Sequence, residues 1–302
     1  MTDTKPNPVV AAWTGDGKRR FLFEDMDVRG EIVHLDRVLA DIHAIHAYPP
    51  GVSRLLGEFV AAAVLLASTL KFRGSLTVQA RSDAQVPLIM AECSSDLEVR
   101  AIARGADDAT AVEFSQLLGN GVLTLTVTPA RGKRYQGIVP LAGQSLAASI
   151  DAYFDQSEQV GTRLYLACSG ERAAGLLLQQ LPAQRVRDAA LRDEHWQRIS
   201  ILADTLSTAE LLAHSEGEVL RRLFNEETVR LYDQEAVRFH CSCSQDRTLA
   251  ALSTIGEAEI RNILDEQGAI TMDCEFCNQR YVFRESDLRG LLDGPADPGG
   301  LH

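Results

Sequence analysis

The sequence predicts an α+β protein of three parts: a layered N-terminal α+β domain, a helical linker and a small C-terminal domain. Up to Pro182, short runs rich in Val, Ile, Thr and aromatic residues alternate with helical patterns, and strand pairs outnumber strand–helix–strand repeats. Beyond Pro182 the sequence is more highly charged and its periodicity is helical. Four of the six cysteines gather in two close pairs near the C-terminus.

The N-terminal domain, residues 1–182, is expected to pair its strands in layers with helices. Strands are predicted at residues 21–23, 28–33, 76–81, 87–93, 122–128, 135–140 and 163–168. Helices are predicted at residues 35–46, 54–70 and 146–156. Ser145 precedes the last of these helices and is expected to be its N-cap.

The linker, residues 183–238, is predicted to be helical and metastable. Its apolar stripes are thin, so each residue buries little area and the segment gains little stability by itself. We expect it to fold or melt according to what it docks against. The apolar residues that need a partner include Leu202, Leu206, Leu211 and Leu212.

The C-terminal domain, residues 239–292, contains the paired cysteines. A helix is predicted over residues 256–266, and a hairpin is predicted from residues 269–272 and 280–283 on either side of the second pair. The tail, residues 293–302, is rich in Gly and Pro and is predicted to be disordered.

Charge and hydropathy exclude several classes of protein. The formal net charge is −12. From Cys241 onward the chain has eleven acidic residues and five arginines, so half of the net charge lies in its last fifth. This argues against a protein that grips nucleic acid or anionic lipid. Residues 1–9 lack the pattern of a signal peptide, and the apolar residues 55–70 favour a buried helix over a membrane span. We therefore expect a cytoplasmic protein with no membrane partner.

The pairs Cys241-Ser-Cys243 and Cys274-Glu-Phe-Cys277 are separated by thirty residues. Two close pairs separated by a loop are typical of a four-cysteine zinc site, and a reducing compartment favours metal binding over permanent disulfides. A domain this small has too little core to fold unaided, and a structural metal would supply the missing stability. The sequence therefore predicts a C-terminal zinc-binding domain that holds one Zn²⁺.

Two interpretations of this zinc site remain open. It could be a passive clip, or it could be a redox switch, because thiolates held close together react readily with oxidants. Oxidation of Cys241 with Cys243, and of Cys274 with Cys277, would remove all four ligands and unfold the domain.

The remaining cysteines and histidines give no signal of chemistry. Cys93 and Cys168 end apolar strands and are expected to be small buried side chains. His240 adjoins Cys241 and is treated as a bystander, since four cysteines already complete the site. The other histidines have no metal-binding or catalytic spacing: His34, His43, His46, His195 and His214.

Two other functions fit the cysteine pairs less well. A zinc ribbon that binds nucleic acid would display Lys and Arg, whereas the chain from Cys241 onward carries a net charge of −6 and no lysine. A thiol oxidoreductase normally places its CxxC pair at the start of a helix, but here it lies between two predicted strands. The sequence contains no Walker loop, GxGxxG, GxSxG or HExxH motif. We therefore expect no enzymatic activity.

Long segments of the chain match one known family in order. The chain resembles the redox-regulated bacterial heat-shock holdases, the 33 kDa heat-shock protein family, from about Phe21 to Leu292. The matching segments are Val28–Gly30, Tyr48–Pro49, Leu56–Glu58, Ser68–Phe72, Gly119–Gly121, Tyr135–Leu141, Tyr153–Phe154, Ser157–Gln159, Ala173–Gln179, Arg222–Phe224 and both cysteine pairs. Asn225 departs from the family pattern, in which we expect histidine, and this leaves only linker packing in doubt.

The resemblance implies an ATP-independent chaperone that is inactive when reduced and zinc-bound. It implies that oxidation together with unfolding heat forms the disulfides Cys241–Cys243 and Cys274–Cys277, releases zinc and melts the linker. The oxidised form would be a homodimer and would hold unfolded or partly folded client proteins. We further expect clients to bind the apolar face of the N-terminal domain together with the linker leucines.

Overall fold

The protein is described by a computed structural model that covers residues 15–292, apart from residues 72, 142–143 and 158–159. The predictions for residues 1–9 and for the tail 293–302 lie outside the described residues. The chain forms two compact units, Met1–His240 and Cys241–His302, and each is described by itself. The α+β fold class predicted from the sequence is confirmed.

The first unit is built on two sheets. The first sheet has the order β10-β1-β2-β9-β8, with every neighbouring pair antiparallel. Its strands are β1 (Gly17–Phe23), β2 (Val28–Leu35), β8 (Thr162–Cys168), β9 (Ala173–Gln180) and β10 (Val229–Ala236). The second sheet has the order β11-β5-β4-β3-β6-β7, in which only β11 and β5 are parallel. Its strands are β3 (Gly74–Arg81), β4 (Leu88–Ser94), β5 (Glu98–Arg104), β6 (Val122–Pro129), β7 (Tyr135–Pro140) and β11 (Arg238–Phe239).

Helix α2 (Pro50–Ala67) is the centre of the first unit and packs against strands of both sheets. By length and composition it could span a membrane, but 78% of its apolar window is buried, as expected for a core helix. It begins earlier than predicted because Pro50 is suited to the first helical turn. A Cβ on Gly57 would lie 2.3 Å from Cys168 Sγ, so this glycine allows β8 to approach the helix.

Three further helices complete the core: α1 (Arg37–Ile45), α3 (Phe114–Leu118) and α4 (Leu146–Ser157). The Asp36 side chain accepts a hydrogen bond from the Arg37 amide at the start of α1. The Ser145 hydroxyl accepts a hydrogen bond from the Ala148 amide, 3.1 Å away, which confirms Ser145 as the predicted cap of α4.

The predicted linker is helical only in its first part. It forms α5 (Ala189–Ala203), α6 (Thr208–Ala213) and α7 (Glu216–Leu223). Asp188 caps α5, and Ser207 with Glu210 forms a capping box on α6. The helical prediction was wrong for residues 229–236, which form β10 and pair with β1, as in Phe21 opposite Leu231. This pairing gives the edge of β1 a hydrogen-bonded neighbour.

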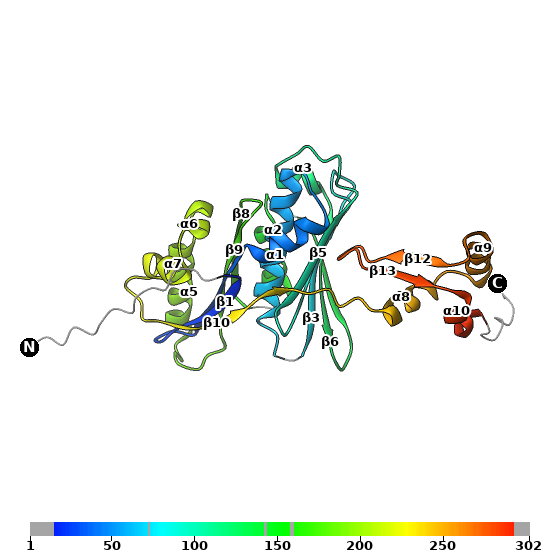
Figure 1. Cartoon of the computed structure of the whole chain (residues 1–302). Helices are drawn as coiled ribbons and strands as arrows, with labels where there is room; N and C mark the ends of the chain where they lie inside the picture. Colours follow the sequence, from blue (N-terminus) through cyan, green and yellow to red (C-terminus); the bar gives the residue numbers. More distant parts are fainter. Residues whose placement is uncertain (1–14, 72, 142–143, 158–159, 293–302) are drawn as a thin grey trace, which may run out of the picture. The chain divides into compact units, whose positions relative to one another are not determined.

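Helices α5, α6 and α7 cover one face of the first sheet, and α2 lies on the other (Figure 1). We call the covered face the docking face. It presents nine buried apolar side chains of the sheet region: Phe21, Phe23, Met26, Val28, Ile32, Ala167, Ala174, Leu176 and Leu178. The linker contributes Ile199, Ala203, Leu211, Val219, Leu220, Leu223 and Phe224 to the same cluster. Leu202, Leu206 and Leu212 are half-buried against it, so the four predicted linker leucines do find a partner here.

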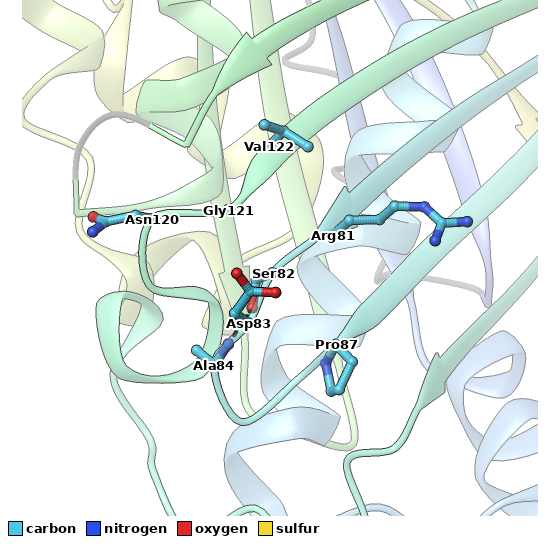
Figure 2. A pocket seen from close by; sticks show the side chains of 8 residues that line it. All are labelled: Arg81, Ser82, Asp83, Ala84, Pro87, Asn120, Gly121 and Val122. Atoms are coloured by element: carbon cyan, nitrogen blue, oxygen red, sulfur yellow. Dashed lines mark hydrogen bonds between the residues drawn. The ribbon is translucent and has the colours of Figure 1, made fainter.

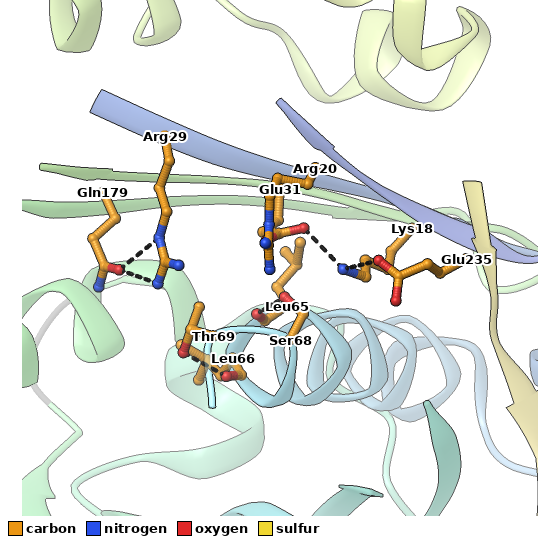
Figure 3. A network of polar contacts seen from close by, with 10 residues as sticks. All are labelled: Lys18, Arg20, Arg29, Glu31, Leu65, Leu66, Ser68, Thr69, Gln179 and Glu235. Carbon is orange, nitrogen blue, oxygen red and sulfur yellow. Dashed lines mark hydrogen bonds and ion pairs between the residues drawn. The ribbon is translucent and has the colours of Figure 1, made fainter. Parts of the chain in front are cut away.

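Strand β10 also supplies a partner for a buried lysine of β1. Lys18 is 2% exposed, and its Nζ lies 3.2 Å from Glu31 and 2.6 Å from Glu235 of β10 (Figure 3). Glu31 also accepts a hydrogen bond from Arg20 Nε, 2.9 Å away. The buried ammonium group of Lys18 is paired with Glu31 of β2. Docking of β10 adds the carboxylate of Glu235 as a second acidic partner.

The second unit is small. Its elements are α8 (Gln245–Leu252), α9 (Glu257–Gln267), β12 (Ile270–Asp273), β13 (Arg280–Phe283) and α10 (Glu285–Leu292). The hairpin of β12 and β13 and the helix at α9 lie where they were predicted. The buried apolar cluster contains five residues: Leu252, Ile260, Ile270, Phe283 and Leu288. A core of this size supports the expectation that the unit needs a further source of stability.

Candidate metal centre

Two loops bring the four predicted cysteines together. Cys241 and Cys243 lie between β11 and α8, directly before Ser244, whose hydroxyl accepts a hydrogen bond from the Arg247 amide at the start of α8. Cys274 and Cys277 lie in the turn between β12 and β13. The sulfur atoms of all four residues lie within 4.8 Å of one another.

The turn that carries the second pair is closed by backbone hydrogen bonds. The Cys274 amide donates to the Gln279 carbonyl over 2.9 Å, and the amides of Cys277 and Asn278 both donate to the Cys274 carbonyl. Asn278 has a φ of 55°, a left-handed conformation that asparagine adopts more readily than most residues. These contacts turn Cys277 back beside Cys274, as a knuckle at a metal requires.

The sulfur positions fit a tetrahedral ion. Zn–S bonds of about 2.3 Å place the four sulfurs of a tetrahedron about 3.8 Å apart. Cys241 Sγ lies 3.6 Å from Cys274 Sγ, and Cys243 Sγ lies 3.4 Å from Cys277 Sγ. All four residues are half-buried, so the site is shielded but still open to small reagents. Such a set of sulfur donors suits zinc.

The thiols also differ in their readiness to ionise. Burial acts to raise the pKa of Cys243, but hydrogen bonds from Tyr281 and the neighbouring thiols outweigh it, and this pKa is lowered. Burial raises the pKa of Cys277, and its thiol neighbours add to the effect. The site therefore accommodates one negative charge readily, whereas four thiolates need a cation among them.

Sequence reasoning missed Tyr281 as part of this centre. Its hydroxyl lies 3.1 Å from Cys243 Sγ and donates to it, and this bond raises the pKa of Tyr281 to about 12. No fixed sequence pattern signals this role, because it depends on the hydroxyl reaching back from the strand after the CxxC turn to the first cysteine pair. Such outer-shell donors orient metal ligands and tune their basicity.

The structure keeps the other candidate residues out of the centre. Cys93 is fully buried and Cys168 half-buried in the first unit, and burial raises the pKa of Cys168 to about 11. His240 Nε2 lies 4.0 Å from Glu98 of β5, and it is not part of the sulfur cluster. Within the described part of the chain, these four cysteines are the one group of three or more His, Cys, Asp or Glu residues placed to hold a metal.

The geometry leaves the disulfide pairing open. Two close sulfur contacts join residues from different pairs, Cys241 with Cys274 and Cys243 with Cys277. All four sulfurs nevertheless lie within 4.8 Å of one another, so the distances single out no pairing. The predicted pairing therefore stays a prediction.

A polar hollow in the first unit does not form a second site. It lies where the β3–β4 turn meets the start of β6 (Figure 2), and its lining residues are Arg81, Ser82, Asp83, Ala84, Pro87, Asn120, Gly121 and Val122. The Ser82 hydroxyl is used within the turn, since it accepts from the Ala84 amide and donates to the Val86 carbonyl. The charged side chains of Arg81 and Asp83 are exposed, so water satisfies them.

Comparisons with known proteins agree with one another. A "33 kDa chaperonin" of Pseudomonas paraeruginosa is 51% identical over 287 residues, which cover 94% of this chain and 97% of that protein. A "33 kDa chaperonin" of Azotobacter vinelandii is 50% identical over 284 residues, which cover 92% of this chain and 95% of that protein. The crystal structure of the 33 kDa chaperonin (heat shock protein 33 homolog) from Thermotoga maritima shares the fold, with a TM-score of 0.76 at 22% identity. That match covers 92% of this chain and 98% of the Thermotoga chain.

The family itself follows from a match over most of the chain. Residues 16–284 match the family described as "Hsp33 protein", a range that includes both sheets, the linker and all four clustered cysteines. With relatives about half identical over nearly the whole chain, this shows that the chain belongs to the Hsp33 protein family.

Proposed function

We propose that this protein is a redox-regulated, ATP-independent chaperone, a holdase that binds unfolding proteins and prevents their aggregation during oxidative and heat stress. The observation that carries the proposal is the docking face. A large apolar sheet surface is covered by a segment of the same chain, and that segment continues through β10 and β11 to the first clustered cysteine. The chaperonin relatives support the same class of activity.

In the resting state, Cys241, Cys243, Cys274 and Cys277 would hold one Zn²⁺. When bound, the ion would stabilise the second unit and keep the four sulfurs as thiolates. The five-residue apolar core of that unit is too small to replace this stabilisation. Folding of the second unit would therefore depend on the state of its thiols.

Strand β11 is the mechanical link between the thiols and the linker. The Arg238 amide donates to the Leu97 carbonyl and the His240 amide donates to the Val99 carbonyl, each over 3.1 Å. Arg238 also pairs with Glu98 at 2.6 Å. Cys241 follows immediately, so disorder that begins at the cysteines reaches β11 and then β10 with no intervening loop.

Oxidation would start the release. In each pair, Cys241–Cys243 and Cys274–Cys277, the two thiolates together would give up two electrons to one peroxide molecule and form an S–S bond, while the peroxide takes up two protons from the solvent and leaves as two waters. The sulfurs then no longer serve as thiolate ligands, and the second unit loses its main stabilisation. Loss of β11 and β10 would free α5, α6 and α7 from the docking face.

The exposed surface would suit unfolded clients. The docking face is apolar and wide, and it carries Phe21 and Phe23, which are packed against Phe224 of the linker at ring-centroid distances of 6.4 and 5.0 Å. An apolar surface of this kind binds many sequences without specificity and also favours self-association. We therefore infer client binding by the released form, with a homodimer as its assembly. We place it in the cytoplasm, without enzymatic activity and without a nucleic-acid or membrane partner.

The proposal is tested by following zinc, thiols and client aggregation in the same samples. Reduced, zinc-loaded protein is treated with peroxide at elevated temperature, and light scattering from an unfolding client is recorded in parallel. We expect zinc release and the loss of four thiols to accompany suppression of aggregation, and Cys243→Ser to hold zinc more weakly and show partial activity without oxidant. Cys93→Ser is the matched control and should behave as the wild type.

The alternative of a passive zinc clip predicts a different result. Zinc would then leave on oxidation without any gain in client protection. Suppression of aggregation that is equal in the reduced and oxidised forms would overturn the redox switch, and absence of suppression in both would overturn the chaperone activity.

A further inference from the structure

One histidine joins the first sheet to two linker helices at once. His34 lies on β2, on the same side as Ile32 of the docking face, and it is 4% exposed. Its Nε2 lies 2.9 Å from the Leu211 carbonyl oxygen in α6. Its Nδ1 lies 3.2 Å from Oε1 of Glu216, the first residue of α7.

The chemistry of the two partners determines the proton count of the ring. A carbonyl oxygen and an ionised carboxylate can only accept hydrogen bonds, so each ring nitrogen is best matched when it carries a proton. In a neutral imidazole one ring nitrogen is an acceptor, and its lone pair would face the lone pair of an acceptor oxygen. The contacts of His34 are therefore those of an imidazolium paired with a buried carboxylate.

Glu216 is also held in its charged form. It is 3% exposed, and burial acts to raise its pKa, but the hydrogen bond and charge of His34 outweigh burial and its pKa is lowered. It lies at the first turn of α7, where the helix dipole favours a negative charge. The two charges are taken out of water together, and each depends on the other.

We propose that His34 and Glu216 form a proton-dependent latch that holds the linker on the docking face. With the proton present, the ring connects β2 to the end of α6 and the start of α7. Without that proton, one of the two contacts is repulsive and Glu216 is buried without the charge of His34. The linker then loosens before any thiol is oxidised. The link from this loosening to client binding rests on the proposed function.

Other charged groups around the latch act on the same balance. Arg19 of β1 adds a positive charge that favours the ionised form of Glu216. Next to His34 in the sheet, β1 presents Gly17 and β9 presents Ala174, neither of which ionises. His214, in the turn between α6 and α7, is paired with Glu218 at 3.3 Å.

A cavity of about 430 Å³ beyond α6 adds two more titratable groups. Leu211 lines it together with the carboxyls Glu58 and Asp151. Burial raises the pKa of Glu58 and of Asp151 to about 7. Both carboxyls therefore change charge within the pH range of the test, and the experiment must separate them from the latch.

Hydrogen exchange of the reduced, zinc-loaded full chain tests the latch without oxidant. Protection of the α6 and α7 amides, corrected for intrinsic exchange rates, should fall about tenfold or more between pH 6 and 9, while β9 stays protected. In Glu216→Gln the side-chain amide can donate to a neutral ring, so the loosening should disappear. Glu58→Gln and His214→Gln are the matched controls and should still loosen. Nitrogen-15 shifts of the His34 ring should report both nitrogens protonated at pH 6.

Two results would overturn the latch: protection of α6 and α7 that is flat with pH in the wild type, or the same loosening in Glu216→Gln. A loosened protein that fails to protect clients would count against the proposed function and leave the latch standing. The two inferences can therefore fail separately.

Discussion

The single residue Glu58 makes the stability of the folded protein depend on pH. It lies on the core helix α2, and burial raises its pKa to about 7 from the ordinary 4.5. The folded state then binds the proton more tightly than the unfolded state does. Its contribution to stability is therefore largest at low pH and is lost as pH rises from about 4.5 to 7.

Glu58→Gln should remove this dependence. We expect the free energy of unfolding of the variant to exceed that of the wild type above pH 7, by up to about 3 kcal/mol, and the difference to shrink toward pH 5. Urea unfolding of reduced protein at several pH values measures it. Glu171→Gln, an exposed site in the β8–β9 turn, is the control. If the free energies of unfolding of the wild type and Glu58→Gln changed in parallel with pH, burial would not raise the pKa of this carboxyl.

Single residues at the metal centre were predictable in part. The gathering of the four cysteines could be predicted because two close pairs separated by a loop are typical of a metal site, and their role as ligands stays a prediction. Tyr281 and Asn278 could not, because their roles depend on a hydroxyl that reaches Cys243 and on a left-handed turn after Cys277. Neither feature has a fixed sequence pattern. His34 was dismissed for want of spacing, since its partners lie 177 and 182 positions away.

At the scale of elements, Phe224 should decide whether the linker docks. It follows α7, is 2% exposed and packs on both Phe21 and Phe23. Phe224→Ala removes about 3–5 kcal/mol of core packing, which is large compared with the stability of a segment of short helices. We expect the reduced protein to bind an apolar dye as strongly as the oxidised wild type, with zinc still present.

Ile201→Ala is the matched control for this experiment. Ile201 lies on α5 of the same linker and is 65% exposed, so its truncation removes an equally apolar side chain with little buried contact. Dye binding should stay at the level of the reduced wild type. Equal dye binding by the two variants would mean that the Phe224 cluster does not hold the linker.

Elements with strong local patterns were predicted correctly, and those defined by distant partners were not. The hairpin at β12 and β13 and the helices at α1, α4 and α9 follow from periodicity and caps. Strand β9 was missed because AAGLLLQQ, buried along most of its length, has no alternation to separate it from a buried helix. The sequence predicts helix at β10, which is rich in charged residues and has no sustained apolar alternation. It becomes a strand only by pairing with β1, more than 200 residues earlier.

At the scale of the whole molecule, the coupling proposed here runs along the chain through a single junction. The last backbone hydrogen bond of β11 is made by His240, and Cys241 begins the second unit. No residue separates the last hydrogen-bonded residue of β11 from the first clustered cysteine. A flexible insertion at this junction should separate the two events, because a Gly/Ser spacer does not transmit the loss of structure on one side to the other.

We therefore predict that about eight Gly/Ser residues inserted between His240 and Cys241 leave zinc content and thiol oxidation as in the wild type but keep α5, α6 and α7 protected from hydrogen exchange after peroxide treatment. The same insertion between Arg131 and Gly132, in a hairpin where a Cβ on Gly132 would meet nothing within 4 Å, is the control and should still release its linker. Release of the linker in both oxidised variants would show that the signal does not pass through β11. If the linker stays docked after oxidation in the junction variant alone, the signal must pass through the backbone between His240 and Cys241, because the two variants differ only in where the spacer is inserted.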